Sequence, residues 1–232
     1  MTIANRIHNI QQIIIETACK YERNPDSIRL LAISKGQPAS AIEEAYAAGL
    51  IEFGENYWQE AQGKIASLQQ LPLIWHFTGP IQSNKAPDIA KHFDWIHSVD
   101  REKIAKMLSQ HRPSHLPPLN VCIQVNLDSE PDKSGVSADE LMPFATLVNQ
   151  LPGLRLRGLM AIPQWHKEED LQYKSLLRLT AIFNDANQQL KLQMDTLSMG
   201  MSDDLIPAIA AGSTLVRIGR ALFGERNTRQ PL

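Results

Sequence analysis

Short apolar segments alternate with amphipathic segments along almost the whole chain. Each apolar run is followed by a stretch in which apolar residues recur at helical spacing, which is typical of strand–helix units. The pattern predicts strands at 29–34, 51–53, 74–77, 95–97, 120–126, 154–160, 195–198 and 214–217. Helices are predicted at 3–22, 40–48, 57–68, 83–92, 101–110, 138–150, 168–190 and from 203 onward.

Strict alternation of strands and helices indicates parallel strands joined by right-handed crossovers. Eight such units close naturally into a barrel, and 232 residues lie near the lower limit for that fold. We therefore predict an α/β protein made of one (β/α)₈ TIM barrel, a single domain over 1–232, with an extra N-terminal helix. An open, doubly wound sheet is the alternative.

Polar residues follow several of the predicted strands at their C-terminal ends, where TIM barrels carry their functional residues. Because these ends meet at one mouth of the barrel, we expect the polar side chains there to face a common site. The candidates are Lys35 after the first strand, Asn56 after the second, His76 in the third, Ser198 at the end of the seventh, and Arg217 and Gly219 at the eighth.

The turns after the last two strands are rich in small residues and resemble a phosphate cup. Ser202 and Asp203 are suitable N-cap residues, so a helix is predicted to begin at Asp203. Backbone N–H groups at such turns bind phosphate, and a phosphate site after strands seven and eight is recurrent in TIM barrels. Two ordinary strand-to-helix turns are the alternative.

Lys35 follows an apolar strand, so the start of its side chain is expected to be buried. Removal from water lowers the pKa of a lysine and makes its neutral amine available to attack a carbonyl carbon. A lysine opposite a phosphate cup indicates pyridoxal 5′-phosphate (PLP), which carries an aldehyde and a phosphate on one small ring. Arg217 is the candidate partner of the pyridine nitrogen, and an ion pair with Asp195 or Asp203 is the alternative.

Seven motifs in order resemble the YggS/PROSC family, the pyridoxal phosphate homeostasis proteins. They are LLAISKGQP, IEFGENYWQEA, WHFTGPIQSNK, IHSVDR, QVNLDSEPDKSGV, LRGLMAIP and LSMGMSDDLIPAIAAGSTLVRIG. The resemblance spans about 28–227 and implies the barrel fold of the alanine racemase barrel domain, fold type III, without the second domain of that enzyme.

The resemblance also implies roles for single residues. Lys35 matches the lysine that forms the internal aldimine with PLP, and Arg217 matches the arginine that faces the pyridine nitrogen. The remaining matches are Ser198, Gly200, Gly219 and Arg220 in the motifs that hold the phosphate, and Asn56 and His76 in motifs that line the site. Arg220 stands where a smaller residue is common, which is harmless if only its backbone N–H meets the phosphate.

Two classes of function remain open. The first is a PLP-binding protein that acts in vitamin B6 homeostasis and delivery without dedicated turnover, with apo PLP-dependent enzymes as possible recipients. The second is a PLP-dependent racemase or decarboxylase, which needs a second base, and Tyr57 is the one tyrosine near the predicted mouth. Lys133 is interpreted as a solvated loop lysine, and transient capture of the aldehyde from Lys35 is the alternative.

Composition restricts the partners and the cellular compartment that we expect for the protein. A net charge of −2 with interspersed signs argues against nucleic-acid binding, and the sequence shows neither an apolar signal core nor a membrane span. Cys19 and Cys122 are far apart, which fits a reducing compartment and excludes a disulfide framework. His111 and His115 are separated by Pro113, so we predict no metal site. We expect a cytoplasmic monomer.

Overall fold

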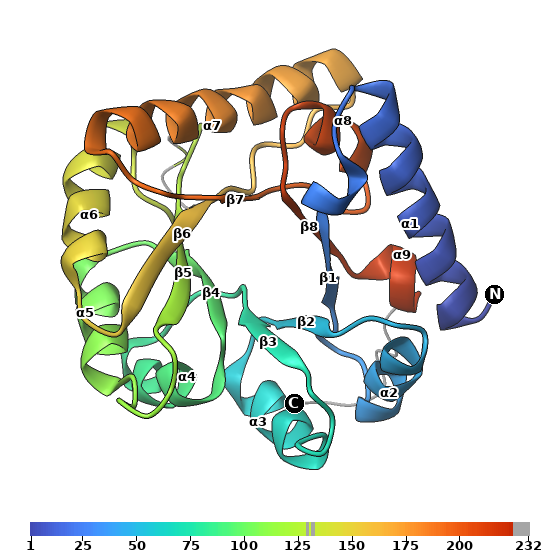
Figure 1. Cartoon of the computed structure of the whole chain (residues 1–232), viewed down its shortest axis with the longest axis horizontal. Coiled ribbons are helices and arrows are strands. Elements are labelled where there is room, and N and C mark those ends of the chain that lie inside the picture. The colour runs from blue at the N-terminus through green and yellow to red at the C-terminus, as the bar shows by residue number, and fades with distance from the viewer. Residues whose placement is uncertain (129, 131–132, 225–232) are drawn as a thin grey trace.

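Eight parallel strands form a closed barrel in the computed structural model, which describes residues 1–128, 130 and 133–224. Each strand pairs with the next one in the sequence, and β8 pairs with β1 to close the ring (Figure 1). The strands are β1 (Arg29–Ile33), β2 (Glu52–Glu55), β3 (Ile74–Phe77), β4 (Trp95–Val99), β5 (Leu119–Gln124), β6 (Leu154–Met160), β7 (Thr196–Ser198) and β8 (Leu215–Ile218). The predicted TIM barrel is therefore confirmed.

Helices surround the barrel, and the N-terminal helix completes their ring (Figure 1). They are α1 (Ile3–Lys20), α2 (Ala39–Ala47), α3 (Trp58–Ser67), α4 (Ala86–His92), α5 (Glu102–His111), α6 (Ala138–Gln150), α7 (Glu169–Leu190), α8 (Leu205–Ala210) and α9 (Arg220–Phe223). Two 3₁₀ turns, η1 (Pro25–Ser27) and η2 (Ser83–Lys85), precede β1 and α4. The short helix α9 is only one turn long. Helix α1 packs against α2, α8 and α9, and its buried face carries Ile7, Ile10 and Ile14.

The element boundaries follow the hydrophobic pattern closely, with one error that concerns the site. A helix predicted to begin at Asp203 begins at Leu205 instead, and its N-cap is Asp204. Asp204 Oδ1 accepts a hydrogen bond from the amide of Met201 at 2.6 Å, which folds the preceding turn back on itself. Asp203 is thereby left on the surface, where it pairs with Arg220. The short helix α9 was not predicted.

The N-terminal end of the barrel is closed by stacked charged and aromatic side chains. Arg29 and Arg157 lie over the ring of Trp95, with guanidinium carbons 4.5 Å and 4.6 Å from its centroid. Each arginine also forms an ion pair, Arg29 with Glu52 and Arg157 with Asp195. Cation–π stacking and ion pairing thus fill this end, and open space remains at the C-terminal ends of the strands.

Within the described part of the chain, no helix is long and apolar enough to cross a membrane.

Candidate cofactor site

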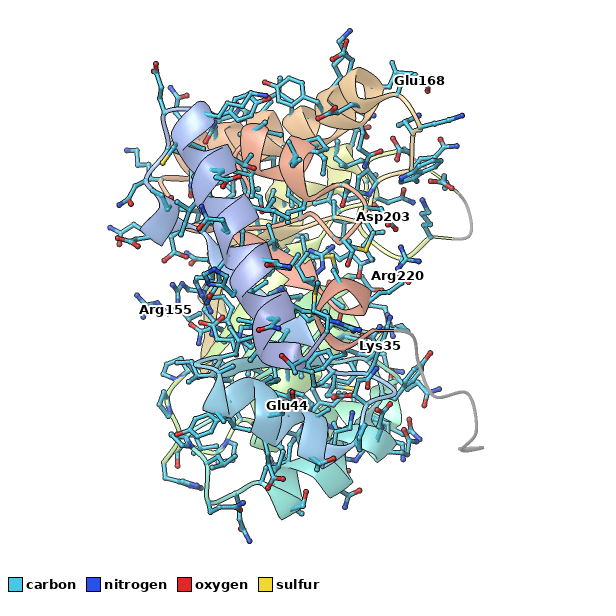
Figure 2. All side chains as sticks on the ribbon, turned by 90° about the vertical axis from the view of Figure 1, so that its right-hand side faces the viewer. Lys35, Glu44, Arg155, Glu168, Asp203 and Arg220 are labelled. Carbon is cyan, nitrogen blue, oxygen red and sulfur yellow. The ribbon has the colours of Figure 1, made fainter. Side chains whose placement is uncertain are left out.

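An open cavity of about 620 Å³ lies at the C-terminal ends of the strands. Five predicted residues line it, namely Lys35, Asn56, Arg217, Gly219 and Arg220. Figure 2 shows Lys35, Asp203 and Arg220 at one end of the molecule and Arg155, near the start of β6, at the opposite end. The structure therefore brings together residues that are far apart in the sequence, as barrel closure predicts.

Lys35 follows β1, and the backbone on both sides of it is fixed by side chains of α3. The carbonyl oxygen of Ser34 accepts a hydrogen bond from Lys64 Nζ at 2.7 Å. The amide of Gly36 donates to Glu60 Oε1 at 2.6 Å, and Gly36 has a φ of 72°, which favours glycine. Lys35 itself is half-buried at the cavity wall.

A buried charged cluster lies behind this segment, and we call Ser34, Glu55, Glu60 and Lys64 the Lys64 cluster. Lys64 Nζ contacts Glu55 Oε1 at 2.7 Å and Glu60 Oε1 at 2.5 Å, and Ser34 Oγ donates to Glu55 Oε1 at 2.6 Å. Burial raises the pKa of Glu55, and Lys64 opposes this shift. Sequence reasoning missed the cluster, although Glu60 and Lys64 show the i, i+4 spacing of a helical ion pair.

Arg217 lies at the end of β8 and is held by backbone and side-chain acceptors. Its Nη1 donates to the carbonyl oxygen and to Oγ of Ser198, and its Nη2 donates to the carbonyl oxygen of Ala161 at 3.0 Å. Burial lowers the pKa of Arg217 to about 10. The alternative ion pair is wrong, because Asp195 pairs with Arg157 and Asp203 pairs with Arg220.

The predicted phosphate cup is built from the two turns at 199–202 and 218–220, which we call the phosphate-side turns. Met201, Ser202, Gly219 and Arg220 line the cavity from these turns. Gly200 does not line it but ties the first turn to β8, because its carbonyl oxygen accepts a hydrogen bond from the amide of Arg217 at 2.9 Å. Its φ is 95°, and a Cβ there would lie 2.5 Å from Ala208 Cβ, so only glycine fits.

Arg220 and Asp203 form an exposed ion pair across the rim of the cavity, with 2.6 Å between Nη2 and Oδ1. Their side chains are 65% and 60% exposed. Both residues line the cavity, so the guanidinium group of Arg220 can also reach an anion placed there. Asp203 was predicted as an N-cap and as an alternative partner of Arg217, and the pairing with Arg220 could not be inferred from its position in the sequence.

Asn56 follows β2 and is positioned by the next strand. Thr78 Oγ1 donates to Asn56 Oδ1 at 3.1 Å, and both residues line the cavity. Gly79 permits this close approach, since a Cβ on it would lie 2.1 Å from the carbonyl oxygen of Asn56. Thr78 is a lining residue that sequence reasoning did not select.

Two predicted residues, His76 and Ser198, lie in the barrel interior and are not among the residues that line the cavity. His76 on β3 contacts His97 on β4, and His97 contacts Ser198 on β7. Ser198 in turn contacts Arg217, so both residues connect to the cavity through that guanidinium group.

Lys133 lies in the segment after β5 and contacts Glu130 of the same segment. It does not line the cavity, and residues 131 and 132 lie outside the described part of the chain. The two interpretations of Lys133 stay predictions.

The chemistry of the lining groups fits PLP. An amine (Lys35) suits an aldehyde, a donor-only guanidinium (Arg217) suits a ring nitrogen that accepts a hydrogen bond, and the phosphate-side turns suit an anionic tail. The cavity volume of about 620 Å³ falls within the usual range for small-molecule sites.

Comparison with known proteins agrees with this geometry. A family model described as "Alanine racemase, N-terminal domain" matches residues 21–227, so fold and site define a barrel of that class. A pyridoxal phosphate homeostasis protein of Pseudomonas aeruginosa is 55% identical over 230 residues, which cover 99% of this chain and 98% of that protein. The chain belongs to the family of pyridoxal phosphate homeostasis proteins, and the resemblance noted in the sequence is confirmed.

Two solved structures place the fold in context. PipY of Synechococcus elongatus PCC7942, solved with PLP bound, is 38% identical with a TM-score of 0.83, covering 96% of this chain and all (100%) of its own. An alanine racemase of Clostridium difficile 630 is 11% identical with a TM-score of 0.72, covering 97% of this chain and 59% of its own. The second likeness shows the shared barrel fold alone.

Proposed function

We propose that this protein binds PLP covalently through Lys35 and acts in PLP homeostasis and delivery without dedicated catalytic turnover. The neutral Nζ of Lys35 would attack the aldehyde carbon of PLP, and loss of water would leave an imine. The observation that carries the proposal is that Lys35, Arg217 and the phosphate-side turns line one cavity. PipY, solved with PLP bound, supports the choice of cofactor.

Each lining group has a proposed task. Arg217 donates toward the ring nitrogen and keeps a proton off it, because a guanidinium group has no acceptor. The backbone N–H groups of Gly219 and Arg220, together with Ser202, bind the phosphate. Asn56 is proposed to contact the ring from β2. His76 and Ser198 act through Arg217, and Gly200 shapes the phosphate-side turns.

We favour a carrier over a racemase or decarboxylase, because the residues that line the cavity provide no evident second base. Among the described residues no tyrosine, histidine or cysteine lines the cavity, and Tyr57 lies outside it with 52% exposure. Asp203 is the carboxylate that lines it, and it pairs with Arg220 on the phosphate side. An unprotonated ring nitrogen is also a weak electron sink, which lowers the capacity of PLP for carbanion chemistry.

The cavity is open, which suits release of PLP to other proteins. We propose that one domain over 1–232 acts as a monomer and that apo PLP-dependent enzymes receive the cofactor. Nucleic acid and membranes are not proposed as partners, since the net charge is −2 with mixed signs.

The test is to load the protein with PLP, reduce it with borohydride and identify the modified lysine by peptide mass spectrometry. We expect the label on Lys35, a visible absorbance band before reduction, and loss of both in Lys35→Ala. Lys106→Ala, an exposed lysine on α5, serves as the matched control and should keep both signals. A label on another lysine, or a colourless wild type, would refute the covalent role of Lys35.

Absence of turnover is tested on the same samples. Alanine racemisation by the loaded protein should equal the rate of free PLP. Turnover above that rate that disappears in Lys35→Ala would instead establish an enzyme.

A further inference from the structure

A chain of polar side chains crosses the barrel interior from β2 to β8. Glu52 Oε2 lies 3.5 Å from His76 Nε2, and His76 Nδ1 lies 2.9 Å from His97 Nε2. His97 Nδ1 lies 2.7 Å from Ser198 Oγ, which lies 2.8 Å from Arg217 Nη1. Both histidines and Ser198 are 0% exposed, so water does not supply their hydrogen bonds. We call these five residues the interior chain.

The two ends of the interior chain have fixed hydrogen-bonding character. The guanidinium group of Arg217 only donates, and the carboxylate of Glu52 only accepts. Arg217 Nη1 therefore donates to Ser198 Oγ. For each contact that leads from Ser198 through His97 and His76 to Glu52, the donor and the acceptor must then be assigned. A neutral histidine donates from one ring nitrogen and accepts at the other, so the two histidines must share one direction.

In one direction every hydrogen except the one on His76 Nε2 has a hydrogen-bond acceptor. Ser198 Oγ donates to His97 Nδ1, His97 Nε2 donates to His76 Nδ1, and His76 Nε2 points its hydrogen at the carboxylate of Glu52. Both histidines are then Nε2–H tautomers. The 3.5 Å separation at the Glu52 end is long for a hydrogen bond, but the charge and the N–H dipole attract each other.

The opposite direction leaves two groups unsatisfied. His97 Nδ1 would donate to Ser198 Oγ, and the hydroxyl hydrogen would lack an acceptor among the described residues. The lone pair of His76 Nε2 would also face the carboxylate of Glu52, which repels it. A buried hydrogen without an acceptor costs about 1–3 kcal/mol, so the first direction is favoured.

We propose that His76 and His97 are held as neutral Nε2–H tautomers, and that Ser198 and His97 are positioning residues that fix the guanidinium group of Arg217. With Nη1 and Nη2 engaged by Ser198 and Ala161, the remaining N–H groups of Arg217 serve the cavity that it lines. The statement about the ring nitrogen rests on the proposed function, whereas the tautomers do not depend on it.

The surroundings of the interior chain keep the histidines neutral. The titratable and charged groups around the chain are Arg29, Glu52, Cys122, Arg157 and Asp204. Burial lowers the pKa of both histidines well below the ordinary value, and each is also repelled by Arg29. Burial raises the pKa of the Cys122 thiol to about 12, so it adds no charge.

The tautomers can be read in the cofactor-free wild type by a long-range ¹H–¹⁵N correlation spectrum of histidine. Of the seven histidines, only His76 and His97 are fully buried, and they should give two neutral Nε2–H patterns that do not change from about pH 8.5 to about pH 6. A neutral Nδ1–H pattern, or titration of either residue in that range, would overturn the proposal.

The positioning role is tested with Ser198→Ala loaded with PLP labelled with ¹⁵N in the ring. We expect a shifted ring-nitrogen signal, about tenfold weaker PLP binding and an unchanged ³¹P signal. Ser175→Ala is the matched control, because Ser175 Oγ is buried on α7 without a hydrogen-bond partner among the described residues. It should change none of the three readouts.

The outcomes separate the possible roles of Ser198. An unchanged ring-nitrogen signal in Ser198→Ala would overturn positioning, and a changed ³¹P signal would assign Ser198 to the phosphate instead. Failure of the proposed function is recognised independently, since borohydride would then label a lysine other than Lys35 while the histidine spectrum of the cofactor-free protein stays the same.

Discussion

The charged groups on the two sides of the cavity differ in burial: they are buried on one side and exposed on the other. On the Lys35 side, the side chains of Glu55 and Lys64 are 0% and 8% exposed. Lys64 donates to the carbonyl oxygen of Ser34, next to Lys35, and Glu55 accepts from the hydroxyl of Ser34. On the other side, Arg220 and Asp203 are mostly exposed, and each has the other as its ion-pair partner among the described charged residues. The backbone that carries Lys35 is therefore held in one position, whereas the ion pair at the rim can rearrange.

This difference suits the proposed capture and release of a cofactor. A buried cluster cannot change partners without a large desolvation cost, so it fixes the backbone from which Lys35 would meet an aldehyde. An exposed pair contributes little free energy and can exchange one partner for another. We infer that the geometry of attachment is set on the Lys35 side, and that retention of the anionic tail is adjusted on the phosphate side.

The largest effect is expected from breaking the buried side. Lys64→Met should lower the free energy of unfolding by about 3 kcal/mol at neutral pH, because Glu55 would be left buried without a counter-charge. Removing Lys64 also removes the interaction that lowers the pKa of Glu55, so this pKa rises further. The folded variant then binds a proton that the unfolded chain releases, and its stability falls as the pH rises toward neutrality. Urea titrations at about pH 5 and pH 7 measure both effects.

A matched pair of exposed charges provides the control. Lys106 and Glu102 on α5 have the same i, i+4 spacing as Glu60 and Lys64, but their side chains are 51% and 54% exposed. Lys106→Met should change the free energy of unfolding by less than about 0.5 kcal/mol. Equal losses in Lys64→Met and Lys106→Met would contradict the contrast between the buried and the exposed side.

A smaller effect on the free energy of unfolding is expected from replacing His97, one of the two buried histidines of the interior chain. This effect depends on pH. Burial lowers the pKa of His76 and His97 in the folded protein, whereas the unfolded chain binds protons near pH 6.5. The stability that these residues contribute is therefore lost as the pH falls below about 6.5, by about 1.4 kcal/mol per pH unit for each histidine. His97→Asn should reduce this slope between about pH 6 and pH 5 by the share of one residue. The same slope in wild type and variant would show that His97 is charged in the folded state.

Most of the fold could be predicted from the sequence, because each strand is a compact apolar run and each long helix has an apolar face. The segments 74–77, 138–150 and 154–160 agree with the structure at both ends. The start of α8 was harder to predict, because Ser202, Asp203 and Asp204 are all suitable N-cap residues. The hydrogen bond from the amide of Met201 to Asp204 Oδ1 accompanies the choice of the last of the three. The one-turn helix α9 is too short for its periodicity to be recognised.

The site was predictable where it follows directly from strand ends and not where it depends on contacts between layers. Lys35 and Arg217 stand at the ends of β1 and β8, so topology alone brings them to one mouth. Ser198 also stands at a strand end, but its side chain points into the barrel because alternate residues of a strand face opposite sides. Glu55 on β2 pairs with Lys64 on α3, and the sequence pattern does not predict a contact between these two elements.

The smallest effect on stability, and the sharpest test of the exposed side, is expected from Asp203→Asn. Loss of an ion pair that is mostly exposed should change the free energy of unfolding by less than about 0.5 kcal/mol. Binding of PLP should nevertheless tighten by about threefold to tenfold, because a carboxylate no longer repels the phosphate or occupies the guanidinium group of Arg220. Equilibrium dialysis at low and high salt measures this change, which screening by salt should reduce.

The substitution Arg220→Ser should show the reverse of Asp203→Asn, namely weaker PLP binding at unchanged stability. If neither substitution alters PLP affinity, the main-chain amides of these turns and Ser202 hold the phosphate, and the ion pair is a surface feature without a part in retention.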